Sequence, residues 1–233
     1  MNERLERLRE KMRERGIDVY VVPTSDFHES EYVGEHFACR KYITGFTGSA
    51  GTAVVTMTEA GLWTDGRYFV QASGQLKGSV VALMKMWVEG VPTVLEYIGQ
   101  KLPERGKLGF DGRVINELLG EDMEAAVSGK HGTVVYGEDL VGMIWEDRPA
   151  LSREPVWILD EKYCGKSAGE KIGDLRRAMK QAGADVHVLT ALDDIVWLLN
   201  IRGNDVPCNP VVLSYLVVTD SQVLFFVQEE ALD

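Results

Sequence analysis

The chain has 233 residues, of which 45% are hydrophobic and 26% charged, and its formal net charge is −11. This composition is typical of a folded globular protein, and the length suits one large domain or two ordinary ones. Nucleic-acid binders and anionic-membrane binders need a basic surface, which the acidic balance argues against. The only basic concentration, Arg4 to Arg15, alternates with glutamates and is typical of an ion-paired helix face. We therefore expect neither nucleic acid nor membrane as a partner.

The cysteine pattern and the N-terminus indicate a cytoplasmic protein. Cys39, Cys164 and Cys208 lie far apart without a C-x-x-C pair, so neither a disulfide framework nor a zinc knuckle is indicated. The first residues form a charged amphipathic pattern without the apolar segment of a signal peptide. No apolar run approaches the ~18 residues of a membrane span.

Apolar periodicity predicts alternating helices and strands over the first 135 residues. We expect helices at 2–15, 30–37, 68–76, 93–101 and 116–128, and strands at 19–22, 52–57, 62–64, 80–86, 108–111 and 132–135. This alternation predicts an α/β fold with a mixed β-sheet flanked by helices. Turn residues and prolines cluster without periodicity across 146–170, which predicts an inter-domain linker.

The start of the chain recurs after this predicted linker. The pattern of Leu8–Val21 reappears in Leu175–Val188, with leucine, arginine, methionine, glycine, aspartate and valines at the same spacing. A similar order of strand, turn and strand follows. We interpret residues 1–155 as a complete domain and 156–233 as the first part of a second, similar domain. We expect its open sheet edge and the apolar segments 211–216 and 223–227 to be exposed, which predicts oligomerisation through the second copy.

The stretch Trp63–Phe69 carries the main functional hypothesis. Asp65-Gly66 supplies turn chemistry, and Arg67 offers five donors suited to a carboxylate or a peptide carbonyl. The alternative is a hairpin in which Arg67 only pairs with Asp65 at the surface. The second copy carries Phe226–Glu229 at roughly this place, so the framework does not require the arginine. This comparison favours a ligand-binding role for Arg67.

Other candidate chemistries are weaker. One twelve-residue segment is rich in metal-capable side chains, but its spacing matches no ligand motif and predicts a polar surface loop: His28, Glu29, Glu31, Glu35, His36 and Cys39. Gly48-Ser-Ala-Gly51 lacks one residue of a nucleophile elbow, and glycines 45, 48 and 51 match no phosphate loop. We expect His187 on one face of a strand and Trp197 in the core. The residues by themselves therefore indicate no catalytic residue and no metal ligand in this chain.

Several longer motifs resemble one family. They occupy 25–32, 45–53, 63–72, 83–86, 144–149 and 190–205. Together they resemble the N-terminal part of the three-domain Xaa-Pro aminopeptidases, the aminopeptidase P group of the creatinase/prolidase-like metallopeptidases. The match runs nearly from end to end.

The resemblance implies an architecture and an activity. In that family two similar α/β domains precede a catalytic "pita-bread" domain, which binds two divalent metal ions, usually manganese, and cleaves before a proline at the second position. We expect that domain to lie outside these 233 residues, and we therefore expect the fragment by itself to be inactive. The N-terminal domains shape the substrate entrance and support a homodimer, and the family's Asp-Gly-Arg turn places its arginine, here Arg67, against bound peptide. The alternative is a stand-alone binding or dimerisation module without peptidase activity.

Overall fold

The computed structural model describes residues 2–232, and the chain divides into two compact units. Unit 1 comprises Met1–Glu31 and Glu35–Pro149, and unit 2 comprises Tyr32–Gly34 and Ala150–Asp233. That residues 1–155 form a complete domain and 156–233 a partial one stays a prediction.

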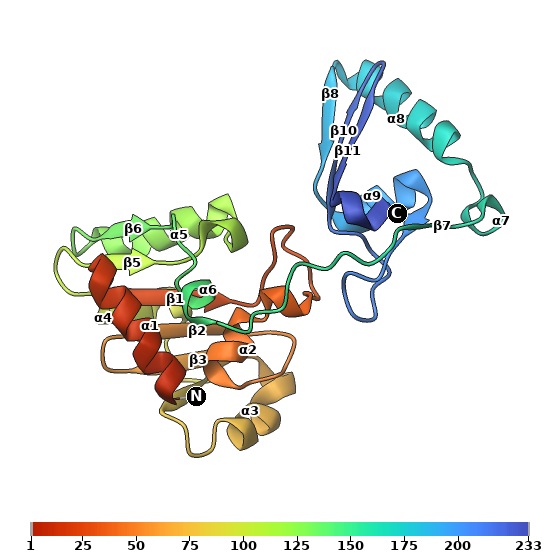
Figure 1. The fold of residues 1–233 in the computed structure, drawn as a ribbon. Helices are drawn as coiled ribbons and strands as arrows, with labels where there is room; N and C mark the ends of the chain where they lie inside the picture. The colour runs from red at the N-terminus through yellow and green to blue at the C-terminus, as the bar shows by residue number, and fades with distance from the viewer. Residues whose placement is uncertain (1, 233) are drawn as a thin grey trace. The chain divides into compact units, whose positions relative to one another are not determined.

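Unit 1 is built on a six-stranded mixed sheet with the order β4-β3-β2-β1-β5-β6 (Figure 1). The strands are β1 (Val19–Pro23), β2 (Thr52–Thr56), β3 (Ala60–Thr64), β4 (Val81–Lys85), β5 (Lys107–Gly109) and β6 (Thr133–Val135). Strand β2 is antiparallel to β1 and β3, whereas the pairs β3–β4, β1–β5 and β5–β6 are parallel. The predicted mixed α/β fold is confirmed.

Helices cover both faces of this sheet because its strands are apolar on both sides. One face, with Tyr20 and Val55, packs against α1 (Asn2–Arg15), α2 (Cys39–Thr44), α3 (Phe69–Gln75) and α6 (Leu140–Ile144). The other face, with Val19 and Trp63, packs against α4 (Val94–Lys101) and α5 (Glu117–Ser128). Side chains alternate along each strand, so the two apolar clusters share the same strands.

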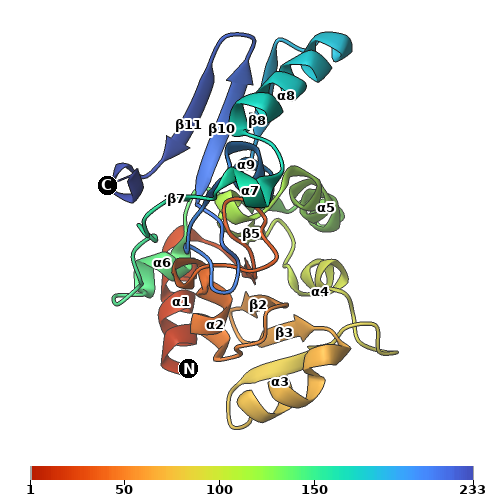
Figure 2. The same ribbon diagram turned by 90° about the vertical axis from the view of Figure 1, so that its right-hand side faces the viewer.

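Unit 2 contains an antiparallel three-stranded sheet with the order β11-β10-β8 (Figure 2). Its strands are β8 (Val186–Leu189), β10 (Ser214–Thr219) and β11 (Val223–Val227), and its longer helices are α8 (Ala168–Ala182) and α9 (Leu192–Leu199). The short strands β7 (Trp157–Ile158) and β9 (Ile201–Arg202) pair separately, and α7 (Glu161–Cys164) and a 3₁₀ turn at Glu229–Leu232 complete the unit. Met179 of α8 and Ile195 of α9 pack with Leu216 and Val218 on one face of the sheet.

The two units repeat one another down to individual hydrogen bonds. In unit 1 the Nε of Arg9 donates to the carbonyl of Thr56 at 2.9 Å, and in unit 2 the Nε of Arg176 donates to that of Thr219 at 2.8 Å. Gly16 and Gly183, which follow α1 and α8, have left-handed φ values of 63° and 66°. The repeat predicted from the sequence is therefore a repeat of structure.

The helix predicted at 30–37 is wrong. Only a 3₁₀ turn at Glu35–Phe37 forms there, because the carboxylate of Asp26 accepts hydrogen bonds from the backbone of His28 and Ser30 and holds a turn instead. The true helix, α2, begins at Cys39, and its six residues are too few to show a clear apolar period.

The predicted linker, core tryptophan and exposed segment also need correction. Residues 146–170 contain β7, α7 and the start of α8, which begins early because Ser167 and Glu170 form a capping box. Trp197 is exposed, and its ring lies 4.1 Å from the ammonium of Lys171. Within the predicted exposed segment 211–216, Val211 and Val212 are buried.

Candidate functional site

The Asp-Gly-Arg turn lies at the carboxyl ends of the parallel strands of unit 1. Strand β3 ends at Thr64, directly before Asp65. Strand β2 runs the opposite way, and its first residue, Thr52, pairs with Trp63. The glycine-containing loop 45–51 that precedes β2 therefore reaches the same edge as the turn. Ligands of open α/β sheets bind at this edge.

Asp65 fixes Arg67 through three hydrogen bonds. Its Oδ1 accepts from the backbone N of Arg67 at 3.0 Å and from Nε at 2.9 Å, and its Oδ2 accepts from Nη2 at 2.8 Å. These bonds raise the pKa of Arg67 and lower the pKa of Asp65, so the pair stays charged. The Arg67 side chain is still 67% exposed, and its guanidinium can receive a ligand.

The surface pair considered from the sequence thus exists, but the hairpin does not. Strand β3 is parallel to β4, and the chain between them passes through the 3₁₀ turn Gly66–Tyr68 and α3. Asp65 caps that turn with its side chain. The structure therefore presents Arg67 at the start of a helix, pre-oriented by its neighbour.

The ring of Tyr68 lies against the guanidinium of Arg67. The Cζ of Arg67 lies 5.3 Å from the centre of the Tyr68 ring, within cation–π distance. The hydroxyl groups of Tyr68 and Ser49 are 2.6 Å apart, and the ring meets Phe46 edge-on at 5.8 Å. The Tyr68 ring that contacts Arg67 is therefore also in contact with two residues of loop 45–51.

A buried arginine holds that loop. Arg40 donates from Nη1 to the carbonyl of Phe46 at 2.6 Å, from Nη2 to the carbonyl of Gly48, and from Nε to Thr24. Burial lowers the pKa of Arg40 to about 10. A Cβ at Gly48 would lie 2.2 Å from the Phe46 ring and 2.7 Å from Tyr68, so only glycine allows this close packing. Loop 45–51 therefore packs closely against the Tyr68 ring, which belongs to the 3₁₀ turn that carries Arg67.

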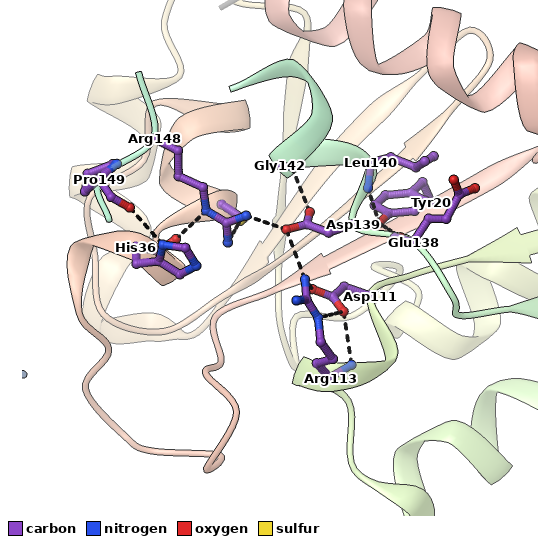
Figure 3. Close-up of polar contacts among 11 residues, drawn as sticks. Tyr20, His36, Asp111, Arg113, Glu138, Asp139, Leu140, Gly142, Arg148 and Pro149 are labelled. Atoms are coloured by element: carbon purple, nitrogen blue, oxygen red, sulfur yellow. Dashed lines mark hydrogen bonds and ion pairs between the residues drawn. The ribbon is translucent and has the colours of Figure 1, made fainter. Parts of the chain in front are cut away.

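A second Asp-Gly-Arg turn follows β5 and repeats the first (Figure 3). Asp111 accepts from the backbone N, Nε and Nη2 of Arg113 at 3.1, 2.9 and 2.9 Å. The Oδ2 of Asp139 lies 3.6 Å from Arg113 and 2.6 Å from Arg148, whose Nε donates to the carbonyl of His36. Sequence reasoning missed this cluster, although the repeated Asp-Gly-Arg could have indicated it.

This second cluster lies at the topological switch point, where β1 has β2 on one side and β5 on the other. The adjoining cavity of about 20 Å³ has room for roughly one water molecule. Two aspartates face two arginines, so the cluster is balanced in charge and ties residues 139–149 to the sheet. The recurrence also shows that the Asp-Gly-Arg bonding pattern forms locally and does not by itself identify a ligand site.

The metal-capable residues of segment 28–39 are dispersed. The Nδ1 of His36 contacts the carbonyl of Pro149 at 2.8 Å, Glu35 pairs with Lys41, and Cys39 accepts from Arg148. Nowhere in residues 2–232 do three or more His, Cys, Asp or Glu side chains gather as a metal site would require. These side chains do not fit a two-metal centre. Among the same residues, no helix is long and apolar enough to cross a membrane.

The register of unit 2 locates the counterpart of Arg67 more closely than the sequence did. Val218 pairs with Val223 as Val55 pairs with Ala60. Counting on from these pairs makes Glu230, which directly follows the predicted segment 226–229, the residue of unit 2 that is equivalent to Arg67. Unit 2 thus carries the opposite charge at this position, and Glu230 pairs with Arg153 at 2.8 Å.

Known proteins resemble both units. The profile described as "Creatinase/Prolidase N-terminal domain" matches residues 4–140, and a second profile of the same description matches 147–233. "Probable Xaa-Pro aminopeptidase P" of Aspergillus niger is 43% identical over 99% of this chain, and "Aminopeptidase P2" of Arabidopsis thaliana is 43% identical over 91%. The chain spans 38% and 30% of their respective lengths.

One solved structure is similar over nearly the whole chain. It is described as "Crystal structure of X-prolyl aminopeptidase from Caenorhabditis elegans: a cytosolic enzyme with a di-nuclear active site". The TM-score is 0.92 at 37% identity, covering 99% of this chain and 39% of that one.

Proposed function

Because this chain belongs to the creatinase/prolidase N-terminal domain family, we propose that it is the N-terminal, non-catalytic region of a metal-dependent Xaa-Pro aminopeptidase. The observation that carries this proposal is the coverage: 99% of the chain aligns with only 38% of a relative of that name. The remaining length of such a relative is where catalytic groups would lie. The activity would release an N-terminal residue that precedes proline.

Within this function we assign Arg67 to substrate binding. The supporting geometry is an exposed guanidinium whose orientation is already fixed by Asp65 and Tyr68. Because the side chain is already oriented, less conformational entropy is lost when a ligand binds. A guanidinium can donate hydrogen bonds to a peptide carbonyl or carboxylate. Arg67 would position the peptide while bond cleavage takes place elsewhere.

The remaining parts of the proposal concern the whole enzyme. Its metal centre would hold two divalent ions, which we propose to be manganese, in a catalytic domain of the same polypeptide. The C. elegans protein is described as cytosolic and di-nuclear, which supports a cytoplasmic metallopeptidase. A homodimer and a role of these domains in shaping the substrate entrance complete the proposal.

A chimera tests this function. The present chain would replace the 234 matched residues of the A. niger relative, ahead of that protein's own remainder. With manganese the chimera should release arginine from Arg-Pro-Pro, whereas residues 1–233 alone should not. Chelator-sensitive turnover by the chain alone would contradict the proposal.

The same chimera tests the role of Arg67. Arg67→Ala should lower kcat/KM roughly 10- to 100-fold, mainly through KM, because a charge-assisted hydrogen bond contributes about 1.5–3 kcal/mol. Arg113→Ala is the matched control, since Arg113 makes the same bonds in the second Asp-Gly-Arg turn. Equal kinetics for the two variants would remove Arg67 from the substrate site.

A further inference from the structure

A groove follows the outer edge of the unit 1 sheet, between α5 and the edge strand β6 (Figure 1). Two hollows of about 560 and 340 Å³ form it. They adjoin, because Glu121 and Glu124 of α5 and Val134 of β6 line both of them. Val127 and Phe110, which are 2% and 4% exposed, belong to the lining as well. The groove therefore has an apolar lining and one acidic wall.

Strand β6 leaves backbone groups available on its outer side. It stands at the end of the sheet order, and among residues 2–232 it pairs with β5 alone. The N–H of Thr133 donates to the carbonyl of Gly106 at 3.0 Å, and the carbonyl of Val135 accepts from the N–H of Phe110 at 3.1 Å. Because backbone groups of successive strand residues point in alternate directions, the N–H and C=O of Val134 face away from β5. The strand contains neither a charge nor a proline to block a further strand.

The acidic wall of the groove has no cationic partner. Glu117, Glu121 and Glu124 lie on one side of α5, since they follow one another at spacings of four and three residues. None of the three forms an ion pair within the part of the chain that the structure describes, residues 2–232. They are separated by about 6 Å and about 4.5 Å along the helix axis. Alternate residues of an extended chain are about 6.6 Å apart, so long basic side chains at alternate positions could reach successive carboxylates.

We propose that this groove binds an extended basic segment of another protein, which adds to β6 as a seventh strand. The backbone of the segment would pair with Val134, and Lys or Arg side chains at alternate positions would face the three glutamates of α5. Extended peptides bind exposed sheet edges in this way, with backbone hydrogen bonds giving affinity and alternate side chains giving specificity. The net charge of −11 favours encounter with a cationic segment. The proposal does not depend on the aminopeptidase function.

A designed peptide tests the groove. Fluorescence anisotropy at low ionic strength measures binding of labelled Thr-Lys-Val-Lys-Val-Lys-Thr to the 233-residue chain. Glu121→Lys should weaken binding by roughly tenfold or more, because it places like charges together in the groove. Asp122→Lys is the matched control, since it makes the same change of charge at the exposed neighbouring residue, which does not line the groove. It should weaken binding by less than about twofold.

Glu124→Lys is the second groove variant, because Glu124 is also exposed and lines both hollows. It should weaken binding as Glu121→Lys does. A peptide that is methylated on every internal backbone nitrogen keeps its charges but cannot donate backbone hydrogen bonds to the strand, and it should not bind. In amide NMR spectra the signal of Val134 should shift with the unmethylated peptide, and its hydrogen exchange should slow.

Three outcomes would overturn the proposal. Equal weakening by Glu121→Lys and Asp122→Lys would show only non-specific attraction of a cation to an acidic protein. Equal binding of the methylated peptide would show that no strand is added to β6. Slower exchange at Val134 in the peptide-free chain as its concentration rises would assign the edge to a second copy of this chain.

Discussion

The hydroxyl groups of Ser49 and Tyr68 lie 2.6 Å apart and join the loop before β2 to the turn after β3. Because the Tyr68 ring also lies under the guanidinium of Arg67, this bond links the backbone of loop 45–51 to the proposed substrate contact. The bond therefore connects two segments, loop 45–51 and the turn after β3, that are not strands of the sheet.

A double-mutant cycle should detect this bond. We expect Ser49→Ala and Tyr68→Phe each to lower the free energy of unfolding by about 1 kcal/mol, with a coupling energy of similar size, because a partly buried hydrogen bond contributes this much. Tyr68→Leu should cost about 1 kcal/mol more, since it also removes the ring contacts with Phe46 and Arg67. Urea unfolding measures all of these, and strictly additive single effects would contradict the bond.

The pKa of the Asp65 carboxyl should depend on the presence of Arg67. Hydrogen bonds from Arg67 lower the pKa of Asp65 below its ordinary value of 3.8. The stabilisation is therefore present above pH 3.8 and is lost as the pH falls through the lowered pKa. In Arg67→Ala the pKa should rise towards 3.8, as measured by carbon NMR titration of the side-chain carboxyl. Arg113→Ala should leave it unchanged, and an unchanged pKa in Arg67→Ala would refute the pairing.

The two arginines around Asp139 should contribute very differently to stability. Arg148 and Asp139 are 16% and 11% exposed and 2.6 Å apart, whereas Arg113 is 58% exposed and 3.6 Å away. Arg148→Met should therefore lower the free energy of unfolding by about 2–4 kcal/mol, because it leaves a largely buried carboxylate without its closest partner. Arg113→Met should cost less than about 1 kcal/mol. Denaturation followed by tryptophan fluorescence distinguishes the two, and a reversed order would contradict the geometry.

The three cysteines should react in a fixed order. Burial raises the pKa of Cys39 to about 12, so only about one thiol in ten thousand is ionised at pH 8. Cys208 is exposed, and Cys164 is half-buried. Iodoacetamide at pH 8 should alkylate Cys208 first and Cys39 last, as read by peptide mass spectrometry. All three should react in denaturant, and early modification of Cys39 in the native protein would contradict the raised pKa of its thiol.

The sequence by itself determined the repeated framework. Leu8 and Met12 recur as Leu175 and Met179 because each helix packs the same apolar stripe against its sheet. Spacing of this kind can be recognised in a single sequence. It also singled out Asp65-Gly66-Arg67, since turn chemistry beside buried aromatic residues is a local pattern. Short elements such as α2 and β7 were missed because they are too brief to show a period.

Only the tertiary structure decided which distant residues meet. Asp111, Asp139 and Arg148 come together because β1 and β5 adjoin at the switch point and α6 packs nearby, and no local spacing encodes that proximity. The pairing of β10 with β11 identified Glu230 as the equivalent of Arg67, and the pairing of β10 with both β8 and β11 brought Val188 and Phe226 to one face of the unit 2 sheet. Strand register depends on contacts across the whole sheet, which is why it had to be observed in three dimensions.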